Sequence, residues 1–337
     1  MNLHKLFSLK EYNTFNIDVK SAYSFFYLSD ESIFELSRSD IFQNNKILVL
    51  GGGSNILFAD DFNGLVIHMM SKGIEIVKEE DDFVYVKAAA GEIWDEFVEY
   101  CVNKNYAGVE NLSLIPGTVG AAPVQNIGAY GVELKDVFFE LNALNRNTQE
   151  KEKFNISDCK FAYRNSVFKN EFKDKFIILD VIFKLTKKHK LNLEYGRLKE
   201  ELSEIIAPGI KDVRDAVIRI RESKLPDPEK FPNAGSFFKN PVIPEREYLK
   251  LKKEFPQLVS YPAGEGKTKL AAGQLIDLCG WKGKRENGVG VYDHQALVIV
   301  NYSSVCGKDI YDFSEKVKQS VYKKFGVEIE REVTIIG

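Results

Sequence analysis

Two glycine-dense segments constrain the fold of this chain more than any other feature. LGGGSN covers residues 50–55 and directly follows the short apolar run KILVL, residues 46–50. IPGTVGAAPVQNIGAYG covers residues 115–131 and has little side-chain bulk between its glycines. Glycine lets main-chain N–H groups approach a phosphate closely. An ordinary tight loop is the simpler interpretation of either segment alone. Both together, with Gln125 and Asn126 inside the second, indicate a pyrophosphate-binding cradle.

The two most familiar nucleotide-binding fingerprints do not fit these segments. A G-x-G-x-x-G fingerprint that starts with Gly51 and Gly53 needs its third glycine where this chain has Ile56. A P-loop built on GEGKT, residues 264–268, needs a glycine where this chain has Tyr261. The mismatches argue against these folds and favour a different way of holding a nucleotide.

Apolar periodicity predicts a mixture of strands and helices along the whole chain. We expect strands at residues 46–50, 65–69, 83–89, 137–144, 176–185 and 296–301. We expect helices in EIWDEFVEYCV, DVRDAVIRIR, AAGQLIDLC and the segment that carries Ile310, Phe313, Val317 and Val321. A chain of 337 residues suggests about two or three domains, and the break at APGIK, residues 207–211, predicts a boundary. The fold class expected is α+β.

Composition narrows the classes of ligand and compartment. The net charge of -3 gives no global attraction to nucleic acid, so an anionic ligand must meet local basic groups. The four cysteines form no CxxC pair, which favours reduced thiols over disulfides or a zinc site, and the four histidines are equally scattered. The N-terminal stretch has neither the apolar core of a signal peptide nor a membrane-spanning run. We therefore expect a cytoplasmic protein without a metal centre.

Eight motifs occur in order along the chain: NTF (13–15), LGGGSN, IPGTVGAAPVQNIGAYG, FAYRNSVFK (161–169), KLPDP (224–228), NAGSFFKNP (233–241), KLAAGQLID (269–277) and EIEREV (328–333). Together they resemble the UDP-N-acetylenolpyruvoylglucosamine reductases, which are bacterial flavoenzymes of peptidoglycan synthesis. The PVQNIGAYG form and the loop that carries Tyr261 look like the longer of the two types in this family. The resemblance runs from residue 13 to the C-terminus.

The resemblance implies an α+β flavin-binding fold of the vanillyl-alcohol-oxidase type, in two lobes, with a separate α+β substrate-binding domain. It implies a first FAD-binding lobe at 1–70, a second at 71–210, a substrate-binding domain at 211–326 and a C-terminal strand at 327–337 that returns to the active site. The implied FAD contacts are Gly51, Gly52, Gly53, Ser54, Asn55, Pro116, Gly117, Thr118, Ala122, Ile127, Gly128 and Tyr130. The family often has other small residues at Thr118, Ala121 and Ala122, and that difference affects one hydrogen bond to the cofactor rather than the binding mode.

The family reaction uses NADPH and FAD to reduce the enolpyruvyl double bond of a UDP-sugar to a lactyl ether, and three residues match its catalytic set. Ser236 resembles the serine that protonates the intermediate. Arg164 resembles the arginine that grips the substrate carboxylate, a task that suits a permanently charged fork. Glu332 resembles the residue that hydrogen-bonds the developing charge, which requires a raised pKa if it acts protonated. Without the family, these residues are interpreted as a turn serine, a surface arginine and a solvated carboxylate on a strand.

The remaining matches bind the substrate, most of them at its UDP group. They are Tyr163, Tyr195, Lys224, Asn240, Tyr261, Lys269 and Gln295, with Tyr261 resembling a mobile lid tyrosine that covers the diphosphate. For Tyr195 and Gln295, half-buried strand residues remain an alternative interpretation. The expected partners are small molecules, namely NADPH and UDP-N-acetylglucosamine enolpyruvate, with no nucleic acid and no membrane, and we expect a monomer.

Two other functions remain open at this point. One is a different FAD-dependent oxidase or dehydrogenase on the same scaffold, such as a hydroxy-acid oxidase, which accounts for the cradle but not for the substrate-domain motifs. The other is a UDP-sugar-binding module that has lost the flavin, against which the intact glycine loops argue. A yellow colour of the purified protein would exclude the binding module. Slow reaction of the reduced flavin with oxygen would disfavour an oxidase.

Overall fold

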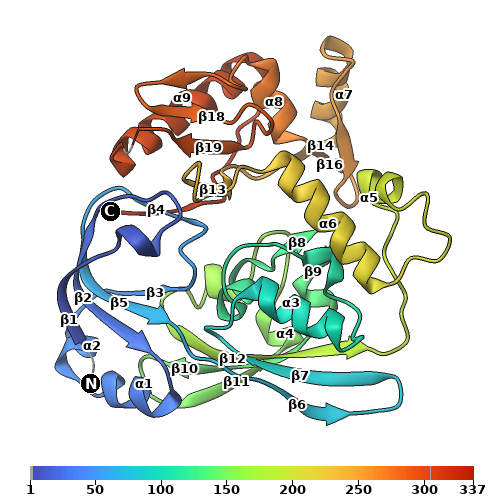
Figure 1. Ribbon diagram of the computed structural model, residues 1–337. Coiled ribbons are helices and arrows are strands. Elements are labelled where there is room, and N and C mark those ends of the chain that lie inside the picture. The colour runs from blue at the N-terminus through green and yellow to red at the C-terminus, as the bar shows by residue number, and fades with distance from the viewer. Residues whose placement is uncertain (1–2, 304) are drawn as a thin grey trace. The chain divides into compact units, whose positions relative to one another are not determined.

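The computed structural model describes residues 3–303 and 305–337, and the chain divides into two compact units (Figure 1). The first unit comprises Met1–Phe7, Ser21–Gly52 and Asn63–Ser223. The second comprises Ser8–Lys20, Gly53–Phe62 and Lys224–Gly337. Both units are discontinuous in sequence, whereas the predicted domains are continuous. The functional division into two FAD lobes, a substrate domain and a returning strand stays a prediction.

The first unit contains a four-stranded sheet in the order β1 (Leu3–Ser8), β2 (Lys20–Tyr27), β5 (Phe62–Met69) and β3 (Ile47–Leu50). Strands β3 and β5 pair in parallel. Helices α1 (Asp30–Ser37) and α2 (Asp40–Asn44) contribute Ile33, Leu36 and Phe42 to its core. The same core contains Leu144, Ile177 and Leu179, which lie on strands of the next sheet. Residues of both predicted FAD lobes therefore contribute to this hydrophobic core.

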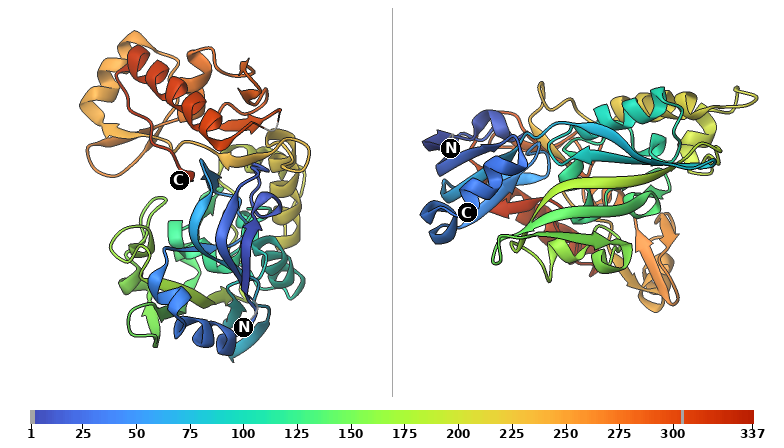
Figure 2. Two further views of the ribbon diagram at one scale, coloured as in Figure 1. Left: turned by 90° about the vertical axis from the view of Figure 1, so that its left-hand side faces the viewer. Right: turned by 90° about the horizontal axis from the view of Figure 1, so that it is seen from below.

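The second sheet of this unit is antiparallel, in the order β11 (Lys151–Asn155), β10 (Phe138–Asn145), β12 (Phe176–Thr186), β7 (Phe83–Ala89) and β6 (Ile74–Glu79). Helices α3 (Trp94–Asn103) and α4 (Ile156–Cys159) lie over one face in Figure 1, and Figure 2 shows the other face from below. Val84, Val86 and Ala88 alternate along β7 and are buried with Trp94 and Phe97 of α3. This alternation is the pattern from which the strand at 83–89 was predicted, and the prediction is confirmed.

Two helices complete the first unit. They are α5 (Gly196–Glu201) and α6 (Ile210–Lys224). Val213, Val217 and Ile220 of α6 are buried in a small cluster with Leu198 of α5, as the helical spacing of α6 predicts. The compact first unit includes α6 up to Ser223, beyond the break predicted at residues 207–211.

The second unit is also α+β. Its main sheet has the order β13 (Asn233–Ser236), β19 (Val298–Asn301), β18 (Val289–Val291) and β17 (Arg285–Glu286), and it is accompanied by α8 (Ala272–Leu278) and α9 (Gly307–Phe325). A smaller sheet joins β14 (Val242–Pro244), β16 (Lys267–Leu270) and β15 (Ser260–Pro262) beside α7 (Glu245–Glu254). Strands β4 (Ile56–Phe58) and β20 (Thr334–Ile336) pair in parallel.

Short elements connect these parts. The two-stranded pair is β8 (Gly128–Ala129) and β9 (Val132–Glu133). The 3-10 helices are η1 (Lys10–Tyr12), η2 (Glu110–Leu112), η3 (Val119–Gln125), η4 (Leu134–Asp136) and η5 (Val167–Lys169). η3 lies within the second glycine-dense segment, so part of this segment is a 3-10 helix rather than an irregular loop.

Two predicted strands are shorter in the structure. The strand expected at 296–301 begins at Val298, because the N–H of Val298 closes a turn onto the carbonyl of Gln295 at 3.0 Å. The C-terminal strand expected from residue 327 is regular only over β20, where β4 pairs with it. Before β20, a single bridge joins Arg331 to Phe238. The periodicity of burial is nevertheless present, since Ile329 and Val333 are buried and Glu330 is exposed.

Two further findings concern the helices and the possible metal ligands in the described part of the chain. No helix among residues 3–303 and 305–337 combines the length and apolar character needed to cross a membrane. All four cysteines are free thiols, and the same residues hold no group of three His, Cys, Asp or Glu side chains suited to a metal ion.

Candidate active site

The structure brings the two glycine-dense segments into contact within the first unit. A Cβ atom added to Gly51 would lie 2.5 Å from Oγ1 of Thr118, and one added to Gly52 would lie 3.1 Å from Cα of Gly117. The absence of side chains therefore allows the two backbones to approach closely. The sequence predicted two cradle segments, and the structure places them against each other.

The second segment is held in place by the start of α3. The N–H of Trp94 donates to the carbonyl of Gly117 at 3.0 Å, and the N–H of Val119 donates to the carbonyl of Glu92 at 2.9 Å. A bridge between Ile93 and Thr118 lies between these two bonds. Thr118 is therefore fixed at a point where the backbone is paired on both sides.

The first segment continues into the second unit, where the NTF motif supports it. Gly53 has φ +60°, and a Cβ atom there would lie 2.1 Å from the carbonyl oxygen of Tyr12. The carbonyl of Gly53 accepts from the N–H of Thr14 at 3.2 Å. Buried Asn13 holds this turn by donating to the carbonyls of Leu9 and Ile17 and accepting from the N–H of Ile17. This explains why NTF accompanies GGGSN in the sequence.

Ser236 and Glu332 belong to backbone segments that lie side by side in the second unit. The N–H of Glu332 donates to the carbonyl of Phe237 at 2.8 Å, and the N–H of Lys239 donates to the carbonyl of Glu330 at 2.9 Å. Both Ser236 and Glu332 are half-buried. The structure thus joins a motif from the middle of the chain to the motif at its C-terminus.

The GGGSN segment also reaches Glu332. The carbonyl of Asn55 accepts from the N–H of Thr334 at 3.1 Å, and Nδ2 of Asn55 donates to the carbonyl of Glu332 at 3.4 Å. Hydrogen bonds therefore link three separate sequence motifs in the second unit.

The turn before Ser236 is organised by a residue that the site prediction did not include. Asn233 is buried, and its side chain donates to the carbonyl of Phe231 at 2.7 Å and accepts from the N–H of Gly235 at 2.8 Å. Its Nδ2 also lies 3.3 Å from the carbonyl of Pro226 in the KLPDP motif. Asparagine before Ala-Gly is a turn signal in sequence, but its long-range bond to KLPDP is visible only in the structure.

Arg164 lies in the first unit and is tied to the second glycine-dense segment. Its backbone has φ +53°, and Nη2 donates to the carbonyl of Gly128 at 2.7 Å. The same loop is anchored by Ser166, whose hydroxyl donates to the carbonyl of Val124 at 2.7 Å. Asn126 adds a bond from Nδ2 to the carbonyl of Ala162 at 3.1 Å. The arginine is therefore placed by the same segment that forms half of the cradle.

A second arginine near this loop was missed by the sequence analysis. Arg221 of α6 donates from Nε to the carbonyl of Leu114 at 3.2 Å and hydrogen-bonds Tyr130. Burial lowers the pKa of Arg221, and the charge of Arg164 lowers it further. Burial raises the pKa of Tyr130, which the nearby Arg221 partly offsets. The two guanidinium groups form the local basic region that a chain of net negative charge needs for an anionic ligand.

The remaining residues predicted to bind the substrate lie on different elements, some in the first unit and others in the second. In the first unit, the ring of Tyr195 meets that of Tyr130 edge-on at 5.6 Å between centroids, and Tyr163 adjoins Arg164. In the second unit, Asn240 Oδ1 accepts from the N–H of Ala272 at the start of α8, and Gln295 Oε1 lies 3.3 Å from where a Cβ on Gly273 would be. Tyr261 and Lys269 are paired opposite each other on β15 and β16. Lys224 is the last residue of α6.

Comparison with known proteins identifies the family. The chain is 48% identical to the UDP-N-acetylenolpyruvoylglucosamine reductase of Flavobacterium johnsoniae, over the full length of both chains. A family model for the C-terminal domain of UDP-N-acetylenolpyruvoylglucosamine reductase matches residues 227–336. The chain belongs to the UDP-N-acetylenolpyruvoylglucosamine reductases. A reductase of this name from Pseudomonas savastanoi pv. phaseolicola is 46% identical over 98% of each chain. The resemblance stated from the motifs is confirmed.

The reductase fold is confirmed by two further comparisons. A model described as an FAD binding domain matches residues 41–149, which contain both glycine-dense segments. The crystal structure of a UDP-N-acetylenolpyruvylglucosamine reductase from Thermus caldophilus aligns over all of both chains with a TM-score of 0.68 at 21% identity. The predicted α+β class with a flavin-binding domain is therefore correct.

The cradle of this reductase fits a flavin diphosphate. Among the described residues, Oγ1 of Thr118 is one of the few buried side-chain atoms without a hydrogen-bond partner, and it faces Gly51. A buried hydroxyl without a partner costs free energy, which a phosphate oxygen at this place would recover. The chemistry of the donors, a hydroxyl and main-chain N–H groups beside glycine, suits a diphosphate.

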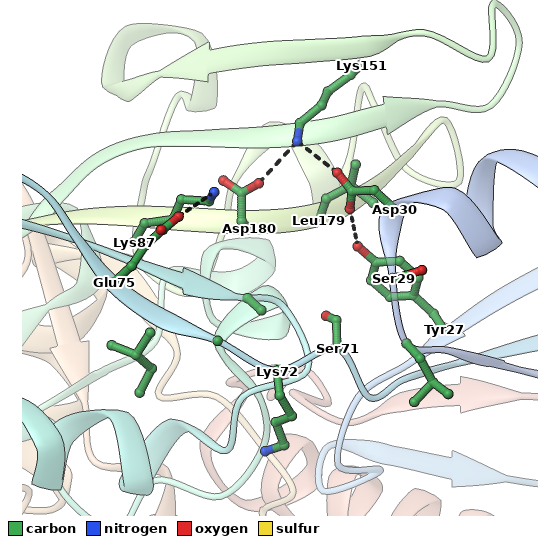
Figure 3. A pocket seen from close by; sticks show the side chains of 14 residues that line it. Tyr27, Ser29, Asp30, Ser71, Lys72, Glu75, Lys87, Lys151, Leu179 and Asp180 are labelled. Atoms are coloured by element: carbon green, nitrogen blue, oxygen red, sulfur yellow. Dashed lines mark hydrogen bonds and ion pairs between the residues drawn. The ribbon is translucent and has the colours of Figure 1, made fainter.

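A separate cavity of about 430 Å³ lies in the first unit and is not the predicted site (Figure 3). Its 14 lining residues include none of the predicted site residues in the described chain. Lys151 pairs with Asp30 at 3.1 Å and with Asp180 at 3.4 Å, and Tyr27 donates to Asp30 at 2.7 Å. These charged groups pair with one another. The pairs connect α1 to the five-stranded sheet at the wall of the cavity.

Proposed function

We propose that this chain is the NADPH-dependent, FAD-mediated reductase that converts UDP-N-acetylglucosamine enolpyruvate to UDP-N-acetylmuramate for peptidoglycan precursors. The names of its full-length relatives and the match to an FAD binding domain support this function. FAD held at the two glycine-dense segments would supply the hydride chemistry between NADPH and the substrate alkene. The residues of the chain must bind the substrate, hold its carboxylate and deliver one proton.

The backbone bond between Glu332 and Phe237, the residue after Ser236, is the observation that carries the mechanism. An alkene carbon that receives hydride leaves negative charge on its neighbour and on the attached carboxylate. We propose that the hydroxyl of Ser236 donates a proton to that neighbouring carbon. The side chain of Glu332 donates a hydrogen bond to the developing charge. Both roles require the two side chains to be held on rigid backbone, which the pairing at Phe237 and Glu332 supplies.

Arg164 is proposed to bind the substrate carboxylate. Its Nη2 donates to the carbonyl of Gly128 at 2.7 Å, and this contact orients the guanidinium group. The adjoining Arg221 adds positive charge to the same region. An arginine that binds a carboxylate bidentately stabilises the charge that develops there.

The other contacts are proposed in two groups. FAD is held by Gly51, Gly52, Gly53, Ser54, Asn55, Pro116, Gly117, Thr118, Ala122, Ile127, Gly128 and Tyr130. The UDP group is held by Tyr163, Tyr195, Lys224, Asn240, Lys269 and Gln295, with Tyr261 as a lid. The pairing of Tyr261 with Lys269 on one hairpin supports the assignment of these two residues to one phosphate-binding element. We expect a monomer in the cytoplasm, where four free thiols are stable.

Stopped-flow measurement of the two half-reactions tests the proposal. In Ser236→Ala we expect NADPH to bleach the flavin at the wild-type rate. Reoxidation by UDP-N-acetylglucosamine enolpyruvate should slow by about three orders of magnitude, because the proton donor is lost. Ser320→Ala, a serine on α9 with no proposed role, is the matched control. Normal reoxidation in Ser236→Ala would remove this serine from the mechanism, and reoxidation of wild type by oxygen alone would indicate an oxidase.

A further inference from the structure

The segment that carries Glu332 has few backbone contacts of its own. It runs from the end of α9, where Gly326 caps the helix with φ +66°, to Thr334, where β20 begins. Between them, the bridge at Arg331 and Phe238 and the bonds at Glu330 and Glu332 are the backbone pairings seen in the described residues. Extended backbone with so few hydrogen bonds needs side-chain anchors to stay in one place.

Arg331 is such an anchor, and its side chain makes three contacts with α9. Its Nε donates to Oγ of Ser314 at 2.9 Å, and its Nη2 donates to a carboxylate oxygen of Glu315. Its guanidinium carbon lies 4.3 Å from the ring centroid of Tyr311. The side chain is only 13% exposed. A planar fork that donates twice and stacks once is fixed in both position and rotation.

The helix that receives Arg331 is itself rigid. α9 spans 19 residues and buries Ile310, Phe313, Val317 and Val321 in the second unit. Ser314 is fully buried and donates its own hydroxyl hydrogen to the carbonyl of Tyr311. A contact with this helix therefore holds Arg331, and with it the backbone of the next residue, in a fixed position relative to the core of the second unit.

We propose that Arg331 is the positioning residue of Glu332. By holding Ser314, Glu315 and the ring of Tyr311, Arg331 keeps the N–H of Glu332 on the carbonyl of Phe237 and so keeps the Glu332 side chain beside the Ser236 segment. This inference rests on the proposed function of Glu332. It adds that the reaction depends on a guanidinium that never touches the substrate.

The test uses Arg331→Met in the full-length, FAD-loaded enzyme, with both half-reactions followed by stopped flow. We expect flavin reduction by NADPH to stay within about twofold of wild type. Reoxidation by UDP-N-acetylglucosamine enolpyruvate should slow at least about tenfold at saturating substrate, with half-saturation changed by less than about threefold. A loss of stability alone would not separate the two half-reactions in this way. Arg331→Lys should recover part of the rate, because an ammonium group reaches Glu315 but cannot form the fork.

A matched control comes from a second ion pair between the same helix and the same segment. Lys318 of α9 lies 4.0 Å from Glu328, and Lys318→Met removes that pair without touching Arg331. We expect wild-type kinetics in this control. Wild-type reoxidation in Arg331→Met, or equal slowing in Lys318→Met, would overturn the proposal.

Two further outcomes are distinguishable. If Arg331→Met does not fold, Glu315→Gln decides the question, because it weakens one of the three contacts of Arg331 and should slow reoxidation by a smaller factor. An unchanged rate in Glu315→Gln would then overturn the proposal. Failure of the wild-type enzyme to be reoxidised by the enolpyruvyl sugar would instead refute the proposed function.

Discussion

At the scale of single residues, Gly53 is the position where backbone conformation and space are most restrictive. Its φ of +60° is strained for any other residue, and its missing Cβ makes room for the carbonyl of Tyr12. We expect Gly53→Ala to lower the free energy of unfolding by about 3 kcal/mol and to weaken FAD retention, because the NTF turn must move away. The unfolding midpoint in urea and the ratio of flavin to protein absorbance measure the two effects.

The control for this substitution is Gly264→Ala. Gly264 also has positive φ, at +92°, but a Cβ there meets nothing within 4 Å. We expect Gly264→Ala to lower the free energy of unfolding by only about 1 kcal/mol, the cost of the backbone conformation alone, and to leave flavin retention unchanged. Equal losses in both variants would show that the close approach to Tyr12 is not what requires glycine at position 53.

Glu332, unlike Gly53, has a proposed role that depends on the chemistry of its side chain rather than on packing. Glu332→Gln keeps the size of the side chain and one hydrogen-bond donor, so we expect a clear but smaller loss than in Ser236→Ala. The loss should fall in flavin reoxidation, with the rate of NADPH oxidation nearly unchanged. Glu330→Gln is the control, because Glu330 is exposed and pairs with Lys239 at 3.2 Å. Unchanged turnover in Glu332→Gln would favour the alternative interpretation, in which EIEREV is a solvated strand without a catalytic role.

At the scale of elements, α3 and α6 are joined by a bidentate ion pair. Arg214 of α6 donates from both terminal nitrogens to Asp95 of α3, at 2.7 and 2.9 Å. Burial acts to raise the pKa of Asp95, but hydrogen bonds from Arg214 and from the N–H of Leu114 outweigh it, and the net pKa lies below its ordinary value. The same segment of α3 supports the second glycine-dense loop.

The sign of the pH effect follows from this direction. Since the folded pKa of Asp95 is lower than the unfolded one, its stabilisation is present above about pH 4 and is lost as the pH falls through the folded pKa. Asp95→Asn should therefore reduce the free energy of unfolding at pH 7 by about 2 kcal/mol and flatten its decline below about pH 4. Urea unfolding between pH 3 and pH 7 measures this. Glu96→Gln, an exposed neighbour, should change neither, and an unaltered acid limb in Asp95→Asn would contradict the assignment.

At the scale of the whole molecule, binding of FAD should stabilise the first compact unit, which contains Gly51, Gly52 and Thr118 among the proposed FAD contacts. The two tryptophans report on one unit each, Trp94 on the first and Trp281 on the second. We expect FAD at about 100 times its Kd to add about 2.7 kcal/mol to the free energy of unfolding. In the variant Trp281→Phe, whose remaining tryptophan Trp94 reports on the first unit, the urea midpoint should rise when FAD is bound. An unchanged midpoint in the presence of FAD would contradict FAD contacts at these residues of the first unit.

Local pattern was enough to predict much of this fold. The alternation of Val84, Val86 and Ala88 predicted the strand at 83–89, which is β7 in the structure. The helical spacing of Val213, Val217 and Ile220 predicted the buried face of α6. Glycine density marked both cradle segments, and eight ordered motifs identified the family. These signals are readable because strand and helix periodicity, and the conformational freedom of glycine, are properties of short stretches of chain.

Only the tertiary structure decided which of these stretches meet. It placed Gly51 against Thr118. It also showed that the segment before Thr334 is held by one bridge and two hydrogen bonds to residues 237–239, and by contacts of the Arg331 side chain with α9. Arg221 and Asn233 were missed because an arginine on a helix and an asparagine in a turn look ordinary until their distant carbonyl partners are known. Long-range partners depend on burial and on the register of pairing between distant segments, and neither leaves a periodic trace in the sequence.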